Sequence, residues 1–258
     1  MTTEEPRFAS RRQRELINYI RTYGTGQVNE LARVLGVSAS TVRRDLIELQ
    51  DQGVLERSHG GAVPAGDAAA STYPLRAATH SDEKHNIARH AATLVEHGST
   101  ILILSGTTTE AMLPFLTTKS DLTVVTNSMV VVNRLSQYPD IELVVLGGVL
   151  WRKELSVLGQ LTIAALAEFR IDKVFSGAYG LDPELGVTRT NLNEVQTDRS
   201  LMTASPCLIV LADSSKFGQH GPARLVPVSA INTLITDHGA DLRTLNRFRG
   251  AGVTVVTT

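Results

Sequence analysis

Hydroxyl and guanidinium side chains gather in one short stretch near the start of the chain, at Ser38, Ser40, Thr41, Arg43 and Arg44. These groups are the donors that proteins direct toward DNA phosphates and the edges of bases. At about 100° per residue, the last four of them fall largely off the apolar stripe of the helix that would hold them. The spacing therefore predicts a recognition helix that offers these side chains to a DNA groove.

The residues before this stretch predict how the recognition helix is positioned. Apolar side chains at helical spacing indicate two amphipathic helices that pack against each other. Gly36 lies at the turn between them, and Ser38 is placed to cap the second helix. A further helix over residues 11–23 supplies the third wall of a small core, with Arg11, Arg12, Arg14 and Arg21 on its solvent side.

The residues after the recognition helix indicate a wing. Val54 to Arg57 has the pattern of a strand, and His59-Gly60-Gly61 follows as a turn. Arg57 and His59 would then lie near DNA phosphates. Helix, turn, capped helix and wing follow in the order of a winged helix-turn-helix, which we predict over residues 7–62.

Charge is distributed unevenly along the chain. Residues 7–59 hold nine arginines, no lysine and six acidic residues, although the whole chain has a formal net charge of −1. A basic end on a weakly acidic chain attracts DNA phosphates through that end alone. The same arginines would also suit the solvated face of an ordinary helical bundle, but the order of the elements favours DNA binding.

A different pattern occupies the rest of the chain. Small, turn-prone residues over 63–80 predict a linker. From 81 to 258, apolar strands alternate with amphipathic helices, which predicts an α/β domain with a Rossmann-like parallel sheet covered on both faces. The expected strands are 100–104, 122–126, 141–146, 173–176, 208–212, 232–236 and 253–256. The expected helices are 82–96, 110–116, 128–136, 161–169, 194–204 and 242–248.

Polar residues follow several of these strands, at the sheet edge where ligands of such domains bind. A glycine, hydroxyl groups and helix N–H groups can together cradle a phosphate. Each of the candidate residues, taken alone, could be only a helix cap, a turn residue or a surface charge, and for Lys84 alone the surface position is favoured. Taken together, they predict an anionic ligand. The candidates are Lys84, Ser105, Gly106, Thr107, Thr108, Thr109, Asn127, Ser128, Gly147, Gly148, Glu194, Asp213 and Lys216.

An enzyme that moves a proton between the carbons of a sugar phosphate would need a carboxylate base beside the anchored substrate. Asp182 precedes a proline and is expected in a turn, Asp198 is expected on a solvated helix face, and Glu194 is best placed to face a ligand. Residues 105–109 lack the lysine of a P-loop, which speaks against a nucleotide triphosphatase. We therefore predict no catalytic residue and no cofactor.

The remaining chemistry-bearing residues give no further site. The seven histidines lack a metal-ligand spacing, so no metal is expected. Cys207 is the single cysteine and lies in an apolar run, which predicts a buried thiol. Residues 151–154 are expected to form a loop near the ligand. The N-terminus lacks the apolar core of a signal peptide, and no apolar run is long enough to span a bilayer, which predicts a cytoplasmic protein without membrane contact.

Val37 to Leu46, Gly53-Val54-Leu55 and His59-Gly60-Gly61-Ala62 resemble the N-terminal signature of the DeoR family of bacterial transcriptional regulators. The resemblance continues over nearly all of the chain. It implies a winged helix-turn-helix joined to a sensor domain that is similar to phosphosugar isomerases and binds a phosphorylated sugar. It also implies that the protein is a repressor, which leaves its operator when this effector binds. The resemblance implies an acidic residue and then a lysine near positions 196 and 198, where this chain has Gln196 and Asp198, and this departure points to different ligand contacts from this helix.

Three functions follow from these patterns. The favoured one is a regulator of carbohydrate-metabolism genes that binds double-stranded operator DNA as a homo-oligomer, a dimer or tetramer, because one winged helix reads only a short site. The second is a sugar-phosphate isomerase or deaminase with a DNA-binding appendage. The third is a constitutive DNA-binding protein whose second domain serves only assembly.

Overall fold

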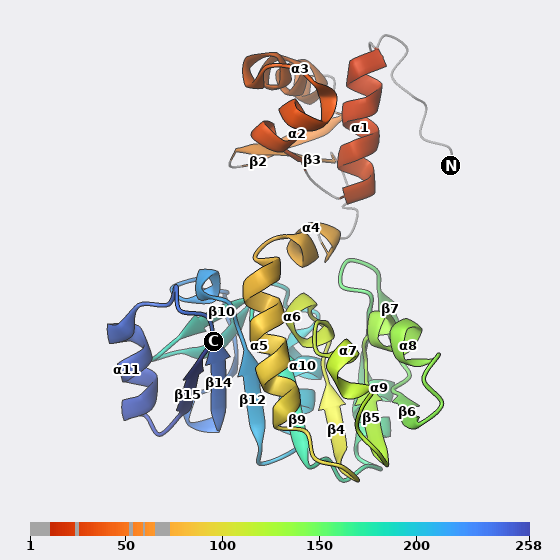
Figure 1. The fold of residues 1–258 in the computed structure, drawn as a ribbon, viewed down its shortest axis with the longest axis vertical. Coiled ribbons are helices and arrows are strands. Elements are labelled where there is room, and N and C mark those ends of the chain that lie inside the picture. Colours follow the sequence, from red (N-terminus) through yellow and green to blue (C-terminus); the bar gives the residue numbers. More distant parts are fainter. Residues whose placement is uncertain (1–10, 24–25, 52–53, 59, 65–72) are drawn as a thin grey trace. The chain divides into compact units, whose positions relative to one another are not determined.

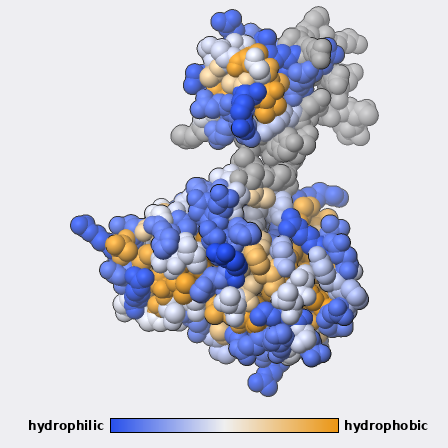
Figure 2. All heavy atoms as spheres, viewed as in Figure 1, coloured by the Kyte–Doolittle hydropathy of each residue, from blue (hydrophilic) through white to orange (hydrophobic). Residues whose placement is uncertain are grey.

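The computed structural model describes residues 11–23, 26–51, 54–58, 60–64 and 73–258. The chain divides into two compact units, Met1–Thr79 and His80–Thr258; Figure 1 shows their elements, and Figure 2 shows that hydrophilic residues cover much of the visible surface of each unit. No helix among the described residues is long and apolar enough to cross a membrane.

The first unit is a small helical core with a three-stranded antiparallel sheet of order β1-β3-β2. Leu16, Leu31, Val42 and Leu49 are fully buried at its centre, as their helical spacing predicts. The predicted helix over residues 11–23 has these bounds in the structure. The elements are α1 (Arg11–Tyr23), β1 (Gly26–Gln27), α2 (Val28–Leu35), α3 (Ala39–Asp51), β2 (Leu55–Ser58), β3 (Gly61–Pro64) and α4 (Tyr73–Ala78).

The segment predicted as a linker contains regular structure at both ends. Strand β3 continues to Pro64, and Tyr73–Ala78 form the helix α4. The middle of the predicted linker, residues 65–72, lies outside the described part of the chain.

The second unit confirms the predicted parallel sheet. All seven expected strands pair in the order β15-β14-β12-β9-β4-β5-β6. The chain builds β4, β5 and β6 outward and then returns to the other side of β4, so the strand order reverses between β4 and β9. The strands are β4 (Thr100–Ile103), β5 (Leu122–Thr126), β6 (Ile141–Val145), β9 (Lys173–Gly177), β12 (Leu208–Leu211), β14 (Thr233–Thr236) and β15 (Thr254–Thr257).

Two apolar cores lie on opposite faces of this sheet, because alternate side chains of each strand point to opposite sides. Ile101 and Ile103 join the core under α5 (Ser81–Thr93), α7 (Leu113–Leu116) and α8 (Met129–Leu135). Leu102 and Leu104 join the core under α9 (Gln160–Leu166), α10 (Val195–Met202) and α11 (Leu242–Gly250). Cys207 is only partly buried against the first of these cores.

The helix predicted over residues 110–116 is wrong in its bounds. Two short helices take its place, α6 (Thr107–Glu110) and α7. Pro114 lies in the first turn of α7, where its missing N–H group is tolerated, but within one continuous helix it would break the ladder.

Several short strands and turns were not predicted. Residues 149–158 form a hairpin of β7 (Val149–Trp151) and β8 (Ser156–Leu158), so Trp151 lies in a strand rather than a loop. A small antiparallel sheet joins β10 (Gly180–Asp182), β11 (Gly186–Arg189) and β13 (Ala223–Val226). Two 3-10 turns are η1 (Ser214–Lys216) and η2 (Val228–Ala230). These strands lie outside the longer apolar runs that indicated the seven strands of the parallel sheet.

Candidate DNA-binding and effector sites

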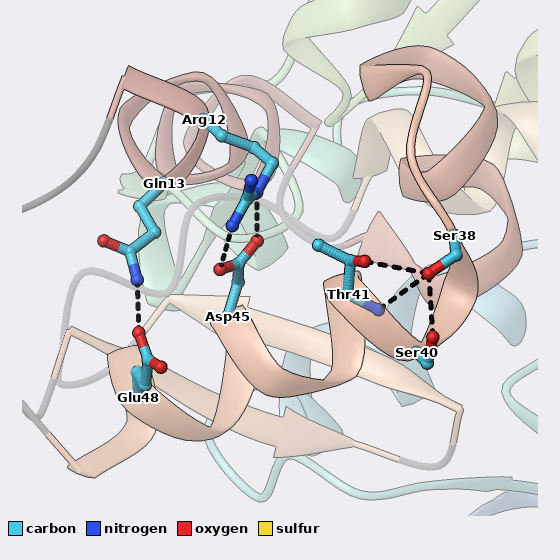
Figure 3. A network of polar contacts seen from close by, with 7 residues as sticks. All are labelled: Arg12, Gln13, Ser38, Ser40, Thr41, Asp45 and Glu48. Carbon is cyan, nitrogen blue, oxygen red and sulfur yellow. Dashed lines mark hydrogen bonds and ion pairs between the residues drawn. The ribbon is translucent and has the colours of Figure 1, made fainter.

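Ser38 caps the helix α3, as the sequence predicted. The backbone N–H of Thr41 donates to Ser38 Oγ at 3.1 Å (Figure 3). Ser38 Oγ also lies 2.7 Å from Ser40 Oγ and 2.8 Å from Thr41 Oγ1. This bonding fixes where α3 begins and gathers three hydroxyl groups at its N-terminus.

The other DNA-contact candidates are accessible where the structure describes them. Arg43 and Arg44 are exposed on α3, one to two turns from its N-terminus, and Arg57 is exposed on β2. His59 lies outside the described residues. Exposed arginines beside a capped helix N-terminus provide positive charge and hydrogen-bond donors on one side of this unit.

An ion pair between the partly exposed Arg12 and the buried Asp45 joins α1 to α3. Arg12 Nε lies 2.6 Å from Asp45 Oδ2 and its Nη2 lies 2.9 Å from Oδ1, while Gln13 Nε2 donates to Glu48 Oε2 at 2.7 Å (Figure 3). The hydrogen bond with Asp45 raises the pKa of the Arg12 guanidinium. The expectation that Arg12 points only into solvent is therefore wrong; an acidic residue on the buried side of α3 was the signal for a partner.

Replacing Arg12 by alanine should destabilise the first unit, because the Asp45 carboxylate, only 2% exposed, would lose its charged partner. Asp45→Asn should cost less, since Arg12 is partly exposed and water can solvate it. Amide hydrogen exchange of α1 and α3 peptides measures the difference. Equal protection in wild type and Arg12→Ala would show that the pair contributes nothing.

In the second unit, the predicted effector residues lie mainly at the carboxyl edge of the sheet. Ser105, Gly106 and Thr107 follow β4 beside the point where the strand order reverses, and each is partly exposed. Thr108 is 6% exposed in α6. Ligands of doubly wound sheets bind at such a crossover, where loops on either side of the sheet diverge.

Three candidates hold this edge together rather than leaving donors to a ligand. Thr109 Oγ1 donates to the carbonyls of Leu104 and Gly106, each at 2.8 Å. Asn127 Oδ1 accepts from the Ser105 N–H at 3.3 Å, and Ser128 Oγ donates to Glu110 Oε1 at 2.7 Å. Thr109, Asn127 and Ser128 are almost fully buried. They position the loop after β4.

The two glycines after β6 differ in their surroundings: Gly148 makes room for neighbouring protein atoms, whereas a Cβ on Gly147 would meet nothing within 4 Å. Thr162 Oγ1 donates to the Gly147 carbonyl at 2.7 Å. A Cβ on Gly148 would lie 2.6 Å from the Leu158 carbonyl oxygen. The close approach of neighbouring backbone thus explains the glycine at position 148, and a role of either glycine in ligand binding stays a prediction.

Asp213 and Lys216 follow β12 at the same edge. Asp213 is fully buried; its Oδ1 accepts from the N–H of Ser215 at 3.1 Å and from the Ser215 hydroxyl. Its other oxygen, Oδ2, is buried and receives no hydrogen bond from the described residues. Lys216 ends η1 and is partly exposed.

Lys84 is 4% exposed in the first turn of α5, so the surface position that its sequence context favoured is wrong. A helix that leads into a parallel strand begins at the carboxyl edge of the sheet. Lys84 therefore lies at the same edge as Asp213, on the face to which α5 packs.

A buried charge cluster lies at the start of α10, where sequence reasoning named the two carboxylates and missed their partner. Arg189 Nη1 lies 2.5 Å from Glu194 Oε2, and Arg189 Nε lies 2.5 Å from Asp198 Oδ2. Asp198 is 2% exposed, so its expected position on a solvated face is wrong. Asp182 does form the expected turn, accepting from the N–H groups of Glu184 and Leu185.

One guanidinium neutralises two carboxylates incompletely. Burial raises the pKa of both Glu194 and Asp198 above the usual range, and attraction to Arg189 opposes this only in part. Burial also disfavours the charged form of Arg189, but the two carboxylates outweigh it and raise its pKa. Both carboxyl groups of the cluster therefore bind a proton more readily than an exposed carboxyl group does.

Comparisons with known proteins agree on both units. Residues 12–65 match the DeoR-like helix-turn-helix domain, and residues 79–238 match the DeoR C terminal sensor domain. The glycerol-3-phosphate regulon repressor of Escherichia coli (strain K12) is 32% identical over 228 residues, 88% of this chain and 90% of the relative. The regulator IolR of Bacillus subtilis (strain 168) is 32% identical over 230 residues, 89% of this chain and 92% of the relative.

Among solved structures, ribose 5-phosphate isomerase A from Methanocaldococcus jannaschii is similar over 54% of this chain and 55% of that chain, with 19% identity and a TM-score of 0.40. A likeness at this level assigns no activity. The sequence relatives named above are regulators of transcription.

Proposed function

Because the chain belongs to the DeoR family of DNA-binding transcriptional regulators, we propose that it represses carbohydrate-metabolism genes and releases its operator when a phosphorylated sugar binds the carboxyl edge of the second unit. The name of the Escherichia coli relative refers to a small phosphorylated metabolite of this kind. Two or more copies would bind repeated half-sites, since one winged helix reads few base pairs.

The phosphate would bind at the loop after β4. Ser105 and Thr107 offer partly exposed hydroxyls, and the first N–H groups of α6 have no partner within the helix. Lys216, and Lys84 through its charge, would add positive potential at the same edge. Thr109 and Asn127 support this role by holding the loop in place.

The single observation that carries the proposal is that polar side chains following two strands lie at the carboxyl edge of the sheet: the partly exposed Ser105 and Thr107 after β4, and Asp213 and Lys216 after β12. Asp213 lies two residues beyond Leu211, so alternation points it to the same face as Ile103 and the loop after it. Strands β12 and β4 are separated by β9 alone, about 10 Å in all, so one small polyhydroxylated phosphate can reach both.

The effector would act by binding one arrangement of the protein better than another. The factor by which the effector weakens operator binding equals the ratio of its affinities for the free and the DNA-bound protein. We propose that the second unit binds its ligand without transforming it, because Glu194 and Asp198, two candidate bases, are already paired with Arg189.

Replacing Thr107 by glutamate tests the phosphate site. A carboxylate at the first position of α6 suits the helix dipole, so the variant should fold, but it should repel a phosphate and reduce effector sensitivity at least about tenfold. Operator release is measured by fluorescence anisotropy against ribose 5-phosphate, glucose 6-phosphate, fructose 6-phosphate and glycerol 3-phosphate, with inorganic phosphate as the ionic control.

Thr107→Ser is the matched control, since it retains the hydroxyl, and its response should equal that of wild type. Operator affinity without effector should be the same in all three proteins. An undiminished response in Thr107→Glu would place the phosphate elsewhere.

A further inference from the structure

Ile47 is an apolar side chain on the otherwise polar face of α3. It is 45% exposed, whereas Val42, Leu46 and Leu49 of the same helix are at most 1% exposed. The remaining exposed residues of α3 are polar or charged: Ser40, Arg43, Arg44, Glu48, Gln50 and Asp51.

Helical geometry places Ile47 in the middle of this polar face. At about 100° per residue, its side chain projects within about 20° of Ser40, 40° of Arg43 and 60° of Arg44. The buried Val42 and Asp45 lie about 140° and 160° away from it. Ile47 therefore projects with the two arginines rather than toward the core of the unit.

The distance from Ser40 to Ile47 along the axis of α3 is also similar to the length of a few base-pair steps. At about 1.5 Å per residue, Ile47 lies about 6 Å beyond Arg43 and about 10 Å beyond Ser40, which corresponds to about three base-pair steps. Ser40, Arg43, Arg44 and Ile47 thus form one continuous strip along α3.

The chemistry of this strip identifies what Ile47 can contact. Arg43 and Arg44, one turn before Ile47, favour a negatively charged partner, whereas the exposed Gln50 and Asp51 follow one turn after it. The β-branched hydrocarbon of Ile47 has no hydrogen bond to offer. Within the major groove, the apolar group on a base edge is the C5 methyl of thymine.

We propose that Ile47 is a specificity-determining residue that packs against a thymine methyl group in each half-site of the operator. This inference rests on α3 being the recognition helix. It adds a preference at one base position that the hydrogen-bonding residues of α3 do not provide, because uracil presents the same hydrogen-bonding groups as thymine.

Deletion of that methyl group from the DNA provides the test. An operator is first selected from a random duplex library with the full-length protein, and each thymine is then replaced singly by deoxyuridine. Burying one such carbon group stabilises a complex by about 0.8 kcal/mol, which is about fourfold in Kd. We expect one replacement per half-site to weaken wild-type binding by about fourfold at fixed salt.

Ile47→Ala should bind the thymine operator more weakly and show no penalty for uracil at that same position. Val34→Ala is the matched control, since Val34 is 52% exposed on α2 and is also apolar. This control should retain the fourfold uracil penalty. Circular dichroism of each variant confirms that α3 is folded.

Two results would overturn the inference: uracil tolerated by wild type at every thymine, or a full uracil penalty retained in Ile47→Ala. A different result identifies failure of the underlying assignment. If the variant with both Arg43→Ala and Arg44→Ala binds the operator as tightly as wild type, α3 is not the recognition helix. If that variant fails to bind while the wild-type protein tolerates uracil at every thymine, only the role of Ile47 is wrong.

Discussion

Replacing both Arg43 and Arg44 by alanine should weaken binding to the operator by about 100-fold or more. A good arginine contact to a base is worth about 1–3 kcal/mol of discrimination, and both arginines project from the exposed face of α3. The helix itself should persist, because alanine favours helix and neither side chain is part of the apolar core.

The salt dependence of the same binding measurement separates two roles for these arginines. An arginine that contacts phosphate alone contributes about one unit to the slope of log affinity against log salt, and its loss weakens all sequences alike. An arginine that contacts a base reduces the preference for operator over random DNA. Fluorescence anisotropy with both DNAs at several salt concentrations distinguishes these cases.

Arg134→Ala with Arg170→Ala provides the matched control. Both residues are exposed in the second unit, so this variant loses the same charge away from α3. Its operator affinity should remain close to that of wild type. Equal losses in the two double variants would show that net charge, rather than the recognition helix, governs binding.

Replacing Arg189 by methionine should destabilise the second unit by about 3–5 kcal/mol at neutral pH. The change leaves Glu194 and Asp198 buried, adjacent and without their guanidinium partner. Urea unfolding followed by tryptophan fluorescence isolates the effect, because Trp151 is the single tryptophan of the chain and lies in this unit.

The loss should be smaller in acid. Because burial raises the pKa of both carboxyl groups, the folded unit binds protons more readily than the unfolded chain. Their protonation therefore favours folding at low pH, and this contribution disappears as the pH rises through the raised values. The deficit of Arg189→Met relative to wild type should shrink as the pH falls from 7 toward that range.

A charge-neutral version supplies the control for this prediction. Arg189→Met combined with Glu194→Gln and Asp198→Asn removes the unpaired charges while keeping similar side-chain volumes. Much of the lost stability should return, with a weaker dependence on pH. If the triple variant is as unstable as Arg189→Met alone, packing rather than charge accounts for the loss.

The elements with strong local signals could be predicted from sequence. The apolar stripe of α3, the cap at Ser38 and the seven strands of the sheet each depend on residues close together in the chain. Polar residues after β4 and β12 were assigned to one edge because carboxyl ends of parallel strands meet there. These inferences require periodicity and topology, both of which the sequence carries.

Contacts between distant residues could not be predicted in the same way. Arg12 and Asp45 are 33 residues apart, and β11 pairs with β13 across more than thirty residues. Asp198 is buried on α10, and its ion-pair partner Arg189 lies on β11, a strand that pairs with β10 and β13 outside the main sheet. Each of these features depends on tertiary packing that overrides local preference.

The most direct test of the proposed function is operator binding by the purified full-length protein at fixed salt. The DNA is the region upstream of the gene that encodes the protein, and binding is measured with and without ribose 5-phosphate, glucose 6-phosphate, fructose 6-phosphate and glycerol 3-phosphate. We expect specific binding that one compound weakens at least tenfold, while inorganic phosphate at the same ionic strength leaves it unchanged. Specific binding unaffected by any phosphorylated sugar would contradict a sugar-phosphate sensor and favour a DNA-binding protein whose second unit serves assembly.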